Sequence, residues 1–95
     1  MTALELTDCN MGIKSRLPAD GLLARIGLLP NTQFLKGVLD LTPVGQIPVN
    51  ENMETKILGI FAAGDVREHS PMQIATAVGD GVSAAMSLGR YLESN

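Results

Sequence analysis

The stretch GIFAAGDVREHSPMQIATAVGDG, residues 59–81, carries the strongest structural signals in the chain. An apolar run over residues 58–63 stops at Gly64-Asp65, and a short polar loop follows it. Continuous apolar runs of this kind suit a strand that is buried on both faces. We therefore expect a buried strand over residues 58–63, with the Asp65 carboxylate at its C-terminal end.

A long helix is expected to follow the polar loop. Ser70 is a suitable N-cap, Pro71 fits the first helical position, and Gln73 completes a Ser-x-x-Gln capping box. Apolar side chains then recur at steps of three and four residues: Ile74, Val78, Val82, Ala85, Leu88 and Leu92. Asp80 falls on the opposite, polar side. The pattern predicts an amphipathic helix over residues 71–93.

The end of the strand and the start of the helix together indicate a ligand site. Ligands of α/β sheets bind outside the C-terminal ends of strands, where the Asp65 carboxylate could accept hydrogen bonds from sugar or ribityl hydroxyls. The backbone N–H groups of Met72, Gln73 and Ile74 lie at the positive end of the helix dipole and would stabilise negative charge on a ligand. Gly64 leaves room for that ligand. On spacing alone, an ordinary turn followed by a capped helix, with no ligand, remains the alternative.

The other segments predict short strands. Residues 3–7 alternate apolar and polar side chains, and residues 21–26 form a second candidate strand. Residues 38–41 and 46–50 flank a Pro- and Gly-containing turn at 42–45, which is a hairpin signal. The expected fold class is α/β: short strands and a hairpin with one long C-terminal amphipathic helix.

Composition excludes several classes of function. The net charge of −3 and the scattered Lys and Arg residues argue against a nucleic-acid partner. No apolar run approaches the ~20 residues of a membrane span, and the N-terminus lacks a signal peptide, so we expect a cytoplasmic protein. Cys9 is the one cysteine and His69 the one histidine, which predicts no disulfide, no metal site and no catalytic residue. We expect His69 to be a solvated or capping residue.

Three segments in order resemble the pyridine-nucleotide disulfide oxidoreductases, and the thioredoxin reductase branch in particular. GIFAAGDV followed by QIATAVGDGVSAAMSLGRYL is similar to their C-terminal flavin motif. DGLLARIGLLPNTQFL resembles the crossover from their nicotinamide domain to their flavin domain. GQIPVNENMETKILGIFAAGDV is similar to the hairpin and strand that follow that crossover. The resemblance spans residues 19–92, which is most of the chain.

The resemblance implies a partial FAD site. In that family the aspartate after the glycine binds a ribityl hydroxyl of FAD, a role that falls on Asp65 after Gly64. The helix N-terminus faces the pyrimidine edge of the flavin, a role that falls on the backbone N–H groups of Met72, Gln73 and Ile74. The usual triplet there is Arg-Gln-Ala. Met72 stands in place of the arginine, so only the backbone role carries over at that position.

The resemblance also implies that the chain is part of a larger FAD/NAD(P)-binding Rossmann-like domain, and it implies a division of the chain and a function. Residues 1–26 would be the end of an NAD(P)H-binding domain, and residues 27–95 the C-terminal part of an FAD-binding domain. The parent enzyme would pass electrons from NADPH through FAD to a disulfide on a thioredoxin-like protein, as a homodimer. The chain lacks a Gly-x-Gly-x-x-Gly loop and a Cys-x-x-Cys pair, so we expect the 95 residues alone to be inactive.

Two alternatives stay open. The chain could be a non-catalytic module or a subunit that completes a flavin site in trans, or it could belong to another branch, such as an NADH oxidase or a peroxide-reductase flavoprotein. In the parent enzyme the apolar side of helix 71–93 would pack on a sheet made mostly of other residues, so we expect this side to be exposed in the chain. Dimers or strand exchange would then cover it.

Overall fold

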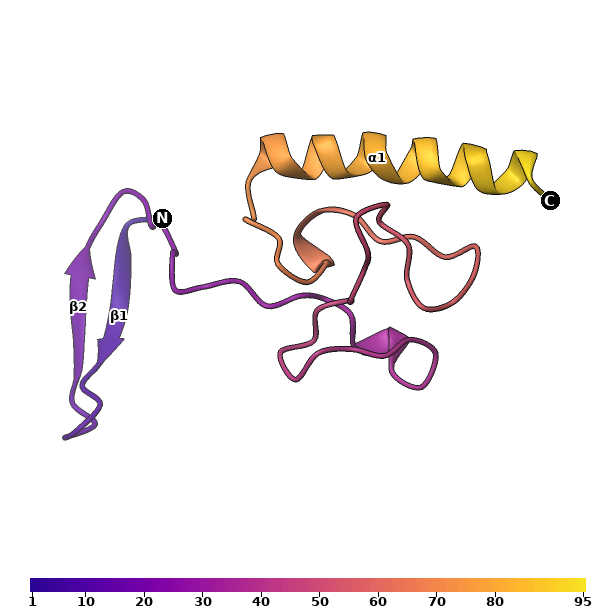
Figure 1. Cartoon of the computed structure of the whole chain (residues 1–95). Helices are drawn as coiled ribbons and strands as arrows, with labels where there is room; N and C mark the ends of the chain where they lie inside the picture. The colour runs from indigo at the N-terminus through magenta and orange to yellow at the C-terminus, as the bar shows by residue number, and fades with distance from the viewer.

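A computed structural model describes all residues, 1–95, and places a β-hairpin at one end and a long helix at the other (Figure 1). The hairpin joins β1 (Ala3–Thr7) to β2 (Lys14–Pro18) in antiparallel register, with Leu4 opposite Leu17. At its tip the Asp8 carboxylate accepts the N–H groups of Asn10 and Met11. This turn folds Lys14–Pro18 back onto β1.

The prediction of a strand over residues 3–7 is confirmed, and that of a strand over 21–26 is wrong. Residues 21–26 run extended toward the body of the molecule and pair with no other segment, so they gain no ladder of hydrogen bonds (Figure 1). The hairpin contacts no other helix or strand. The radius of gyration is therefore 19.6 Å, against about 12 Å for a compact domain of this length.

The middle of the chain is a set of turns with two short 3₁₀ helices, η1 (Gln33–Leu35) and η2 (Gly64–Val66). The turn at 42–45 forms as predicted: the Gly45 N–H donates to the Thr42 carbonyl at 2.8 Å. Its flanks do not pair with one another, so the predicted hairpin strands are wrong. Ile47 instead forms a parallel bridge with Arg67.

The predicted strand over residues 58–63 is also wrong. Phe61 alone forms a bridge, to Glu54. Leu58 is 80% exposed, and no neighbouring strand lies on either side of the run to complete a ladder. Ile47 and Ala62 are the buried apolar residues of the chain, so the hydrophobic core is small.

The helix α1 (Ile74–Glu93) ends where predicted but begins three residues late. Met72 has φ of 56°, in the left-handed region, and Gln73 is extended, so neither can belong to the helix. The Ser70 hydroxyl accepts the Met72 N–H at 3.2 Å and makes no contact with the helix. Ser70 therefore closes a tight turn before the helix, and the predicted capping box does not form.

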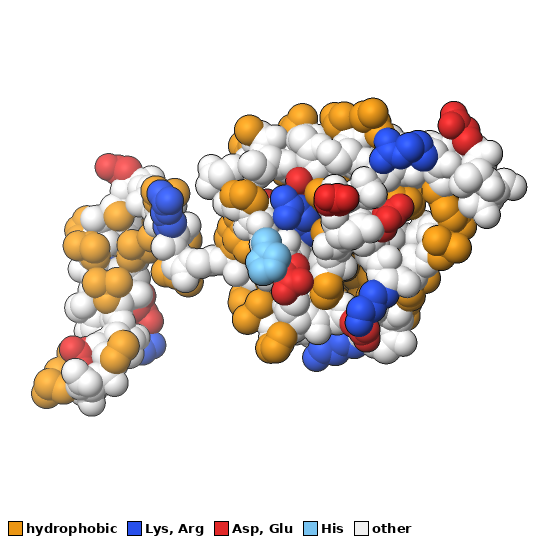
Figure 2. Space-filling view, in the orientation of Figure 1, with side chains coloured by type: hydrophobic (Ala, Val, Ile, Leu, Met, Phe, Trp, Pro, Cys, Tyr) orange, Lys and Arg blue, Asp and Glu red, His pale blue; other side chains and the backbone are white.

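The helix α1 packs on the body of the molecule through its polar side, and its apolar side faces outward. Asp80 and Ser87 are buried against the body of the molecule. Large apolar side chains on the other side are exposed: Ile74, Val78, Val82, Met86 and Leu92. Figure 2 shows apolar side chains along the outer edge of the helix. The predicted exposed apolar surface is thus confirmed, although no helix of the chain has the length and hydrophobicity needed to cross a bilayer.

Candidate functional site

Asp65 lies on η2, immediately beside the first turns of α1. Gly64 precedes it with φ of +82°, a conformation that glycine adopts without steric cost. Gly64 is buried, and a Cβ built on it would lie 3.6 Å from the Cβ of Ala77. The close approach of η2 to the helix places Asp65 next to the N-terminus of α1, with its side chain exposed.

The N-terminus of α1 supplies unpaired hydrogen-bond donors. The first helical hydrogen bond runs from the Ala77 N–H to the Gln73 carbonyl at 3.0 Å. The N–H groups of the four residues before Ala77, from Gln73 to Thr76, donate to no protein acceptor. The predicted donors Gln73 and Ile74 are therefore free. The Met72 N–H is not, because it bonds to Ser70, and Ala75 and Thr76 join the set in its place.

An open depression brings the carboxylate and the helix together. Its lining consists of Asp65, Met72, Ile74, Ala77 and Val78. Its lining combines an anionic acceptor, the Asp65 carboxylate, with residues at the positive end of the dipole of a 20-residue helix. The rest of the lining is apolar. Such a depression suits a ligand that has a hydrogen-bond donor for the carboxylate, apolar surface for the lining and negative charge near the helix N-terminus.

A buried ion pair that the sequence did not reveal lies behind this depression. The Asp80 carboxylate accepts hydrogen bonds from Arg67 Nε at 2.5 Å, from Arg67 Nη2 at 3.0 Å and from the Gly64 N–H at 3.1 Å. The Arg67 and Asp80 side chains are 15% and 9% exposed. Helical periodicity places Asp80 on the polar side of the helix, and the pairing with Arg67 explains why this carboxylate is buried.

The partners of Asp80 also set its protonation. The Arg67 guanidinium, which donates to the Asp80 carboxylate, holds the pKa of that carboxyl below its ordinary value of 3.8, and the Gly64 N–H acts in the same direction. Burial of Asp80 opposes this effect. Hydrogen bonding to Asp80 likewise raises the pKa of Arg67. Both groups are therefore charged at neutral pH.

The remaining candidates lie away from the depression. The His69 ring is 87% exposed, and its Nε2 lies 3.8 Å from a carboxylate oxygen of Glu68. Cys9 is exposed at the tip of the hairpin. No group of His, Cys, Asp and Glu side chains could hold a metal ion.

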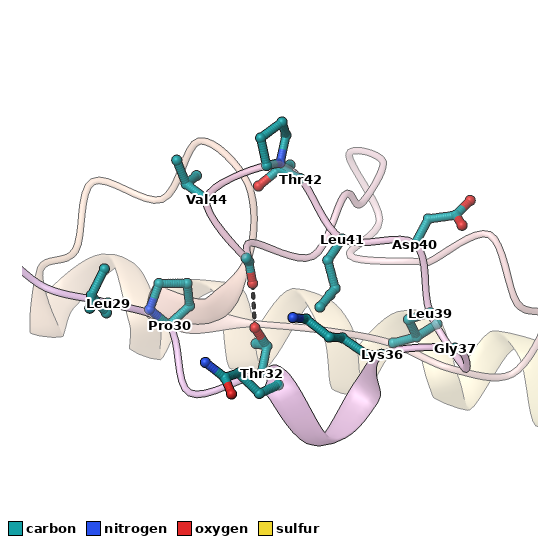
Figure 3. A pocket seen from close by; sticks show the side chains of 13 residues that line it. Leu29, Pro30, Thr32, Lys36, Gly37, Leu39, Asp40, Leu41, Thr42 and Val44 are labelled. Atoms are coloured by element: carbon teal, nitrogen blue, oxygen red, sulfur yellow. Dashed lines mark hydrogen bonds between the residues drawn. The ribbon is translucent and has the colours of Figure 1, made fainter.

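The largest hollow in the chain, of about 680 Å³, lies elsewhere, between residues 29–33 and 36–45 (Figure 3). The Thr32 hydroxyl, which donates to the Gly45 carbonyl, closes one side of it. Its acidic residue, Asp40, is already paired with Lys56 at 3.1 Å. Despite its size, this hollow lacks a free carboxylate beside a helix N-terminus, so the smaller depression at Asp65 is the candidate ligand site.

Comparison with known proteins identifies the class to which this architecture belongs. Residues 3–81 match the family described as "Pyridine nucleotide-disulphide oxidoreductase". That match covers most of the chain, including the hairpin, η2 and the start of α1. The chain therefore belongs to the pyridine nucleotide-disulphide oxidoreductase family, and it resembles the thioredoxin reductases within it.

Individual relatives support this assignment. The chain is 38% identical over 95 residues to an alkyl hydroperoxide reductase component of Staphylococcus aureus, covering 100% of the chain and 19% of the relative. It is 44% identical over 88 residues to thioredoxin reductase of Bacillus subtilis, covering 93% of the chain and 28% of the relative. The chain thus spans less than a third of the length of either relative.

Solved structures agree with the sequences. Thioredoxin reductase from Streptococcus pyogenes superposes on 99% of the chain with a TM-score of 0.75 and 34% identity, using 31% of its own length. The enzyme from T. acidophilum covers 98% of the chain with a TM-score of 0.71 and 39% identity, using 30% of its own length. The predicted family and the predicted fold class are both confirmed.

Proposed function

We propose that this chain forms part of the FAD site of a flavoprotein disulfide reductase. The observation that carries the proposal is the depression in which the Asp65 carboxylate and the N-terminus of α1 lie together. The Asp65 carboxylate, which lines the depression, would accept a hydrogen bond from a ribityl hydroxyl. The free N–H groups of the first turn of α1, where Ile74 lines the depression, would face the pyrimidine edge, and the apolar lining would contact the ring. FAD when bound supplies the redox chemistry, taking up two electrons and passing them on.

The chain's own contribution is to orient and polarise the cofactor. Asp65 accepts a hydrogen bond and fixes the ribityl chain. The N–H groups of Gln73 and Ile74, together with those of Ala75 and Thr76, stabilise negative charge on the pyrimidine edge when the cofactor is reduced. Met72 contributes apolar surface, since its own N–H is already bonded to Ser70. The predicted binding residues Gly64, Asp65, Gln73 and Ile74 are thus retained in the proposal.

In the parent enzyme, we propose that NADPH gives up a hydride and that a disulfide takes two electrons and two protons to become a dithiol. Residues 1–26 would belong to its NAD(P)H-binding domain and residues 27–95 to its FAD-binding domain. The extended segment between the hairpin and the body supports this division (Figure 1). The 95 residues hold a single cysteine, so the reducible pair would have to be supplied from outside them.

The acceptor has two candidates. A thioredoxin-like protein follows from the thioredoxin reductases among the relatives. A peroxide-reducing partner protein is favoured by the alkyl hydroperoxide reductase component, which matches all 95 residues of the chain. A test is to add the chain to a Bacillus subtilis thioredoxin reductase that lacks the matched region, and then to compare NADPH-dependent reduction of the two acceptors.

Titration of FAD with the purified chain, followed by flavin fluorescence and visible absorption, tests the site itself. We expect saturable binding that Asp65→Ala abolishes and Asp40→Asn leaves unchanged, since Asp40 is exposed and remote from the depression. Equal affinity of the wild type and Asp65→Ala would refute the assignment of Asp65. Absence of binding at high micromolar concentration would count against the proposal that these residues form a working part of an FAD site.

We also propose that the chain associates through its exposed apolar surface, as a homodimer or with another polypeptide. Its accessible surface is 7494 Å², against about 5,200 Å² for a compact monomer of the same mass. The excess is comparable to the area buried in stable interfaces. Sedimentation of a monomer that binds no hydrophobic dye would contradict this proposal.

A further inference from the structure

Asp80 is the best-connected side chain of the candidate site, although it lies outside the depression. It receives hydrogen bonds from two residues of the turn that precedes α1: from the backbone of Gly64 and from the side chain of Arg67. Gly64 begins η2 and Arg67 is its C-cap. One carboxylate therefore holds the 3₁₀ turn at both of its ends.

This arrangement determines where Asp65 lies. Asp65 is the middle residue of η2, between the two points that Asp80 holds. Its own carboxylate is exposed and has no protein partner, so nothing but the turn fixes its direction. Asp80 follows Ile74 by six residues along α1, which places it about 9 Å from the start of the helix. A rigid connection therefore runs from the helix, through Asp80, to the turn that carries Asp65.

We propose that Asp80 and Arg67 are positioning residues for the cofactor, which hold the Gly64–Val66 turn so that the Asp65 carboxylate faces the N-terminus of α1. This inference rests on the proposed function. Neither side chain lines the depression, and both act through Asp65. Arg67 contributes more than charge, because its fork meets both carboxylate oxygens of Asp80 and its Nη1 also donates to the Glu68 carbonyl at 3.1 Å.

The test measures FAD affinity for Asp80→Asn and Arg67→Lys at a temperature where circular dichroism shows each variant fully folded. We expect Asp80→Asn to weaken binding at least tenfold, because a loosened turn must be ordered again when the cofactor binds. Arg67→Lys keeps the charge but loses the fork, so a smaller loss is expected. Asp40→Asn, which breaks an exposed ion pair, is the matched control and should leave affinity within twofold.

A double-mutant cycle separates positioning from general stability. If Asp80 acts through Asp65, then Asp80→Asn should change affinity less than twofold once Asp65→Asn is present. An equal loss in both backgrounds, or no loss in the wild-type background, would overturn the inference.

A second measurement tests the inference even if the wild-type chain binds no FAD. Absence of FAD binding would count against the proposed function alone. In that case the amide resonances of residues 64–66 are compared by NMR between the wild type and Asp80→Asn. We expect the Gly64 amide to shift and to lose protection from hydrogen exchange, while the Gly45 amide, in a separate turn, stays unchanged. Unchanged resonances in η2 would overturn the inference.

Discussion

Replacing Asp80 with alanine should remove much of the stability of this fold. The substitution deletes an acceptor of three hydrogen bonds and leaves the Arg67 guanidinium, which is 15% exposed, without its counter-charge. Breaking a buried pair by removing one partner costs about 3–5 kcal/mol. A chain of this length has roughly 5–14 kcal/mol of stability, and with two buried apolar residues we expect the low end.

The assay is urea unfolding of the wild type, Asp80→Ala, Arg67→Met and the double variant, followed by the helical signal of α1 at low temperature. We expect each single variant to lose about 3 kcal/mol or more, with a midpoint of thermal unfolding lower by at least about 12 °C. The double variant should lose less than the sum, because neither buried charge is then left unpaired. Asp40→Asn, in an exposed pair, should cost no more than about 1 kcal/mol. A loss below about 1 kcal/mol for Asp80→Ala would refute the reasoning.

Three further predictions concern the same region. Because the pKa of Asp80 is lowered in the fold, its contribution to stability is present above about pH 4 and is lost as pH falls through the folded-state pKa. The free energy of unfolding should therefore fall less on acidification in Asp80→Asn than in the wild type. Gly64→Ala should destabilise the fold by about 1–2 kcal/mol, since φ is +82°, whereas Gly79→Ala, at an unhindered helical position, should stabilise it by up to about 1 kcal/mol; equal effects would contradict this account. Met72→Asn should raise stability by about 1 kcal/mol, because asparagine tolerates φ of 56° better than methionine; a lower denaturation midpoint would show that Met72 makes a compensating contact.

Local signals in the sequence predicted the elements that are held by short-range contacts. The hairpin strand at Ala3–Thr7, the turn at 42–45 and the C-terminal end of α1 depend on neighbouring residues, and all three form as expected. The apolar run at 58–63 fails as a strand because its pairing requires partner strands, which hydrophobicity alone cannot supply. A local sequence pattern does not reveal whether partner strands are present.

The start of the helix failed for a different reason. Ser70, Pro71 and Gln73 satisfy the rules for a capping box, yet the left-handed backbone at Met72 moves the start of the helix to Ile74. No side-chain preference predicts positive φ at a methionine. As a result, the donors predicted at Gln73 and Ile74 are free and the one at Met72 is not.

The two sides of α1 are held by different forces. Toward the body of the molecule the contact is polar: Asp80 binds Arg67 and Gly64, and Ser87 is buried farther along. Toward solvent the helix presents aliphatic side chains that nothing in this chain covers (Figure 2). A polar contact fixes geometry but buries little apolar surface, so the intact pair specifies where Asp65 lies and adds little net stability, although removal of one partner is costly because it leaves a buried charge unpaired. The exposed side has the opposite character, because apolar contacts there would add stability with little directional preference. It follows that Val82→Lys, on the exposed side, should reduce association and leave the amide resonance of Gly64 unchanged, whereas Asp80→Asn should shift that resonance. A shift of the Gly64 resonance in Val82→Lys would show that the two sides are coupled.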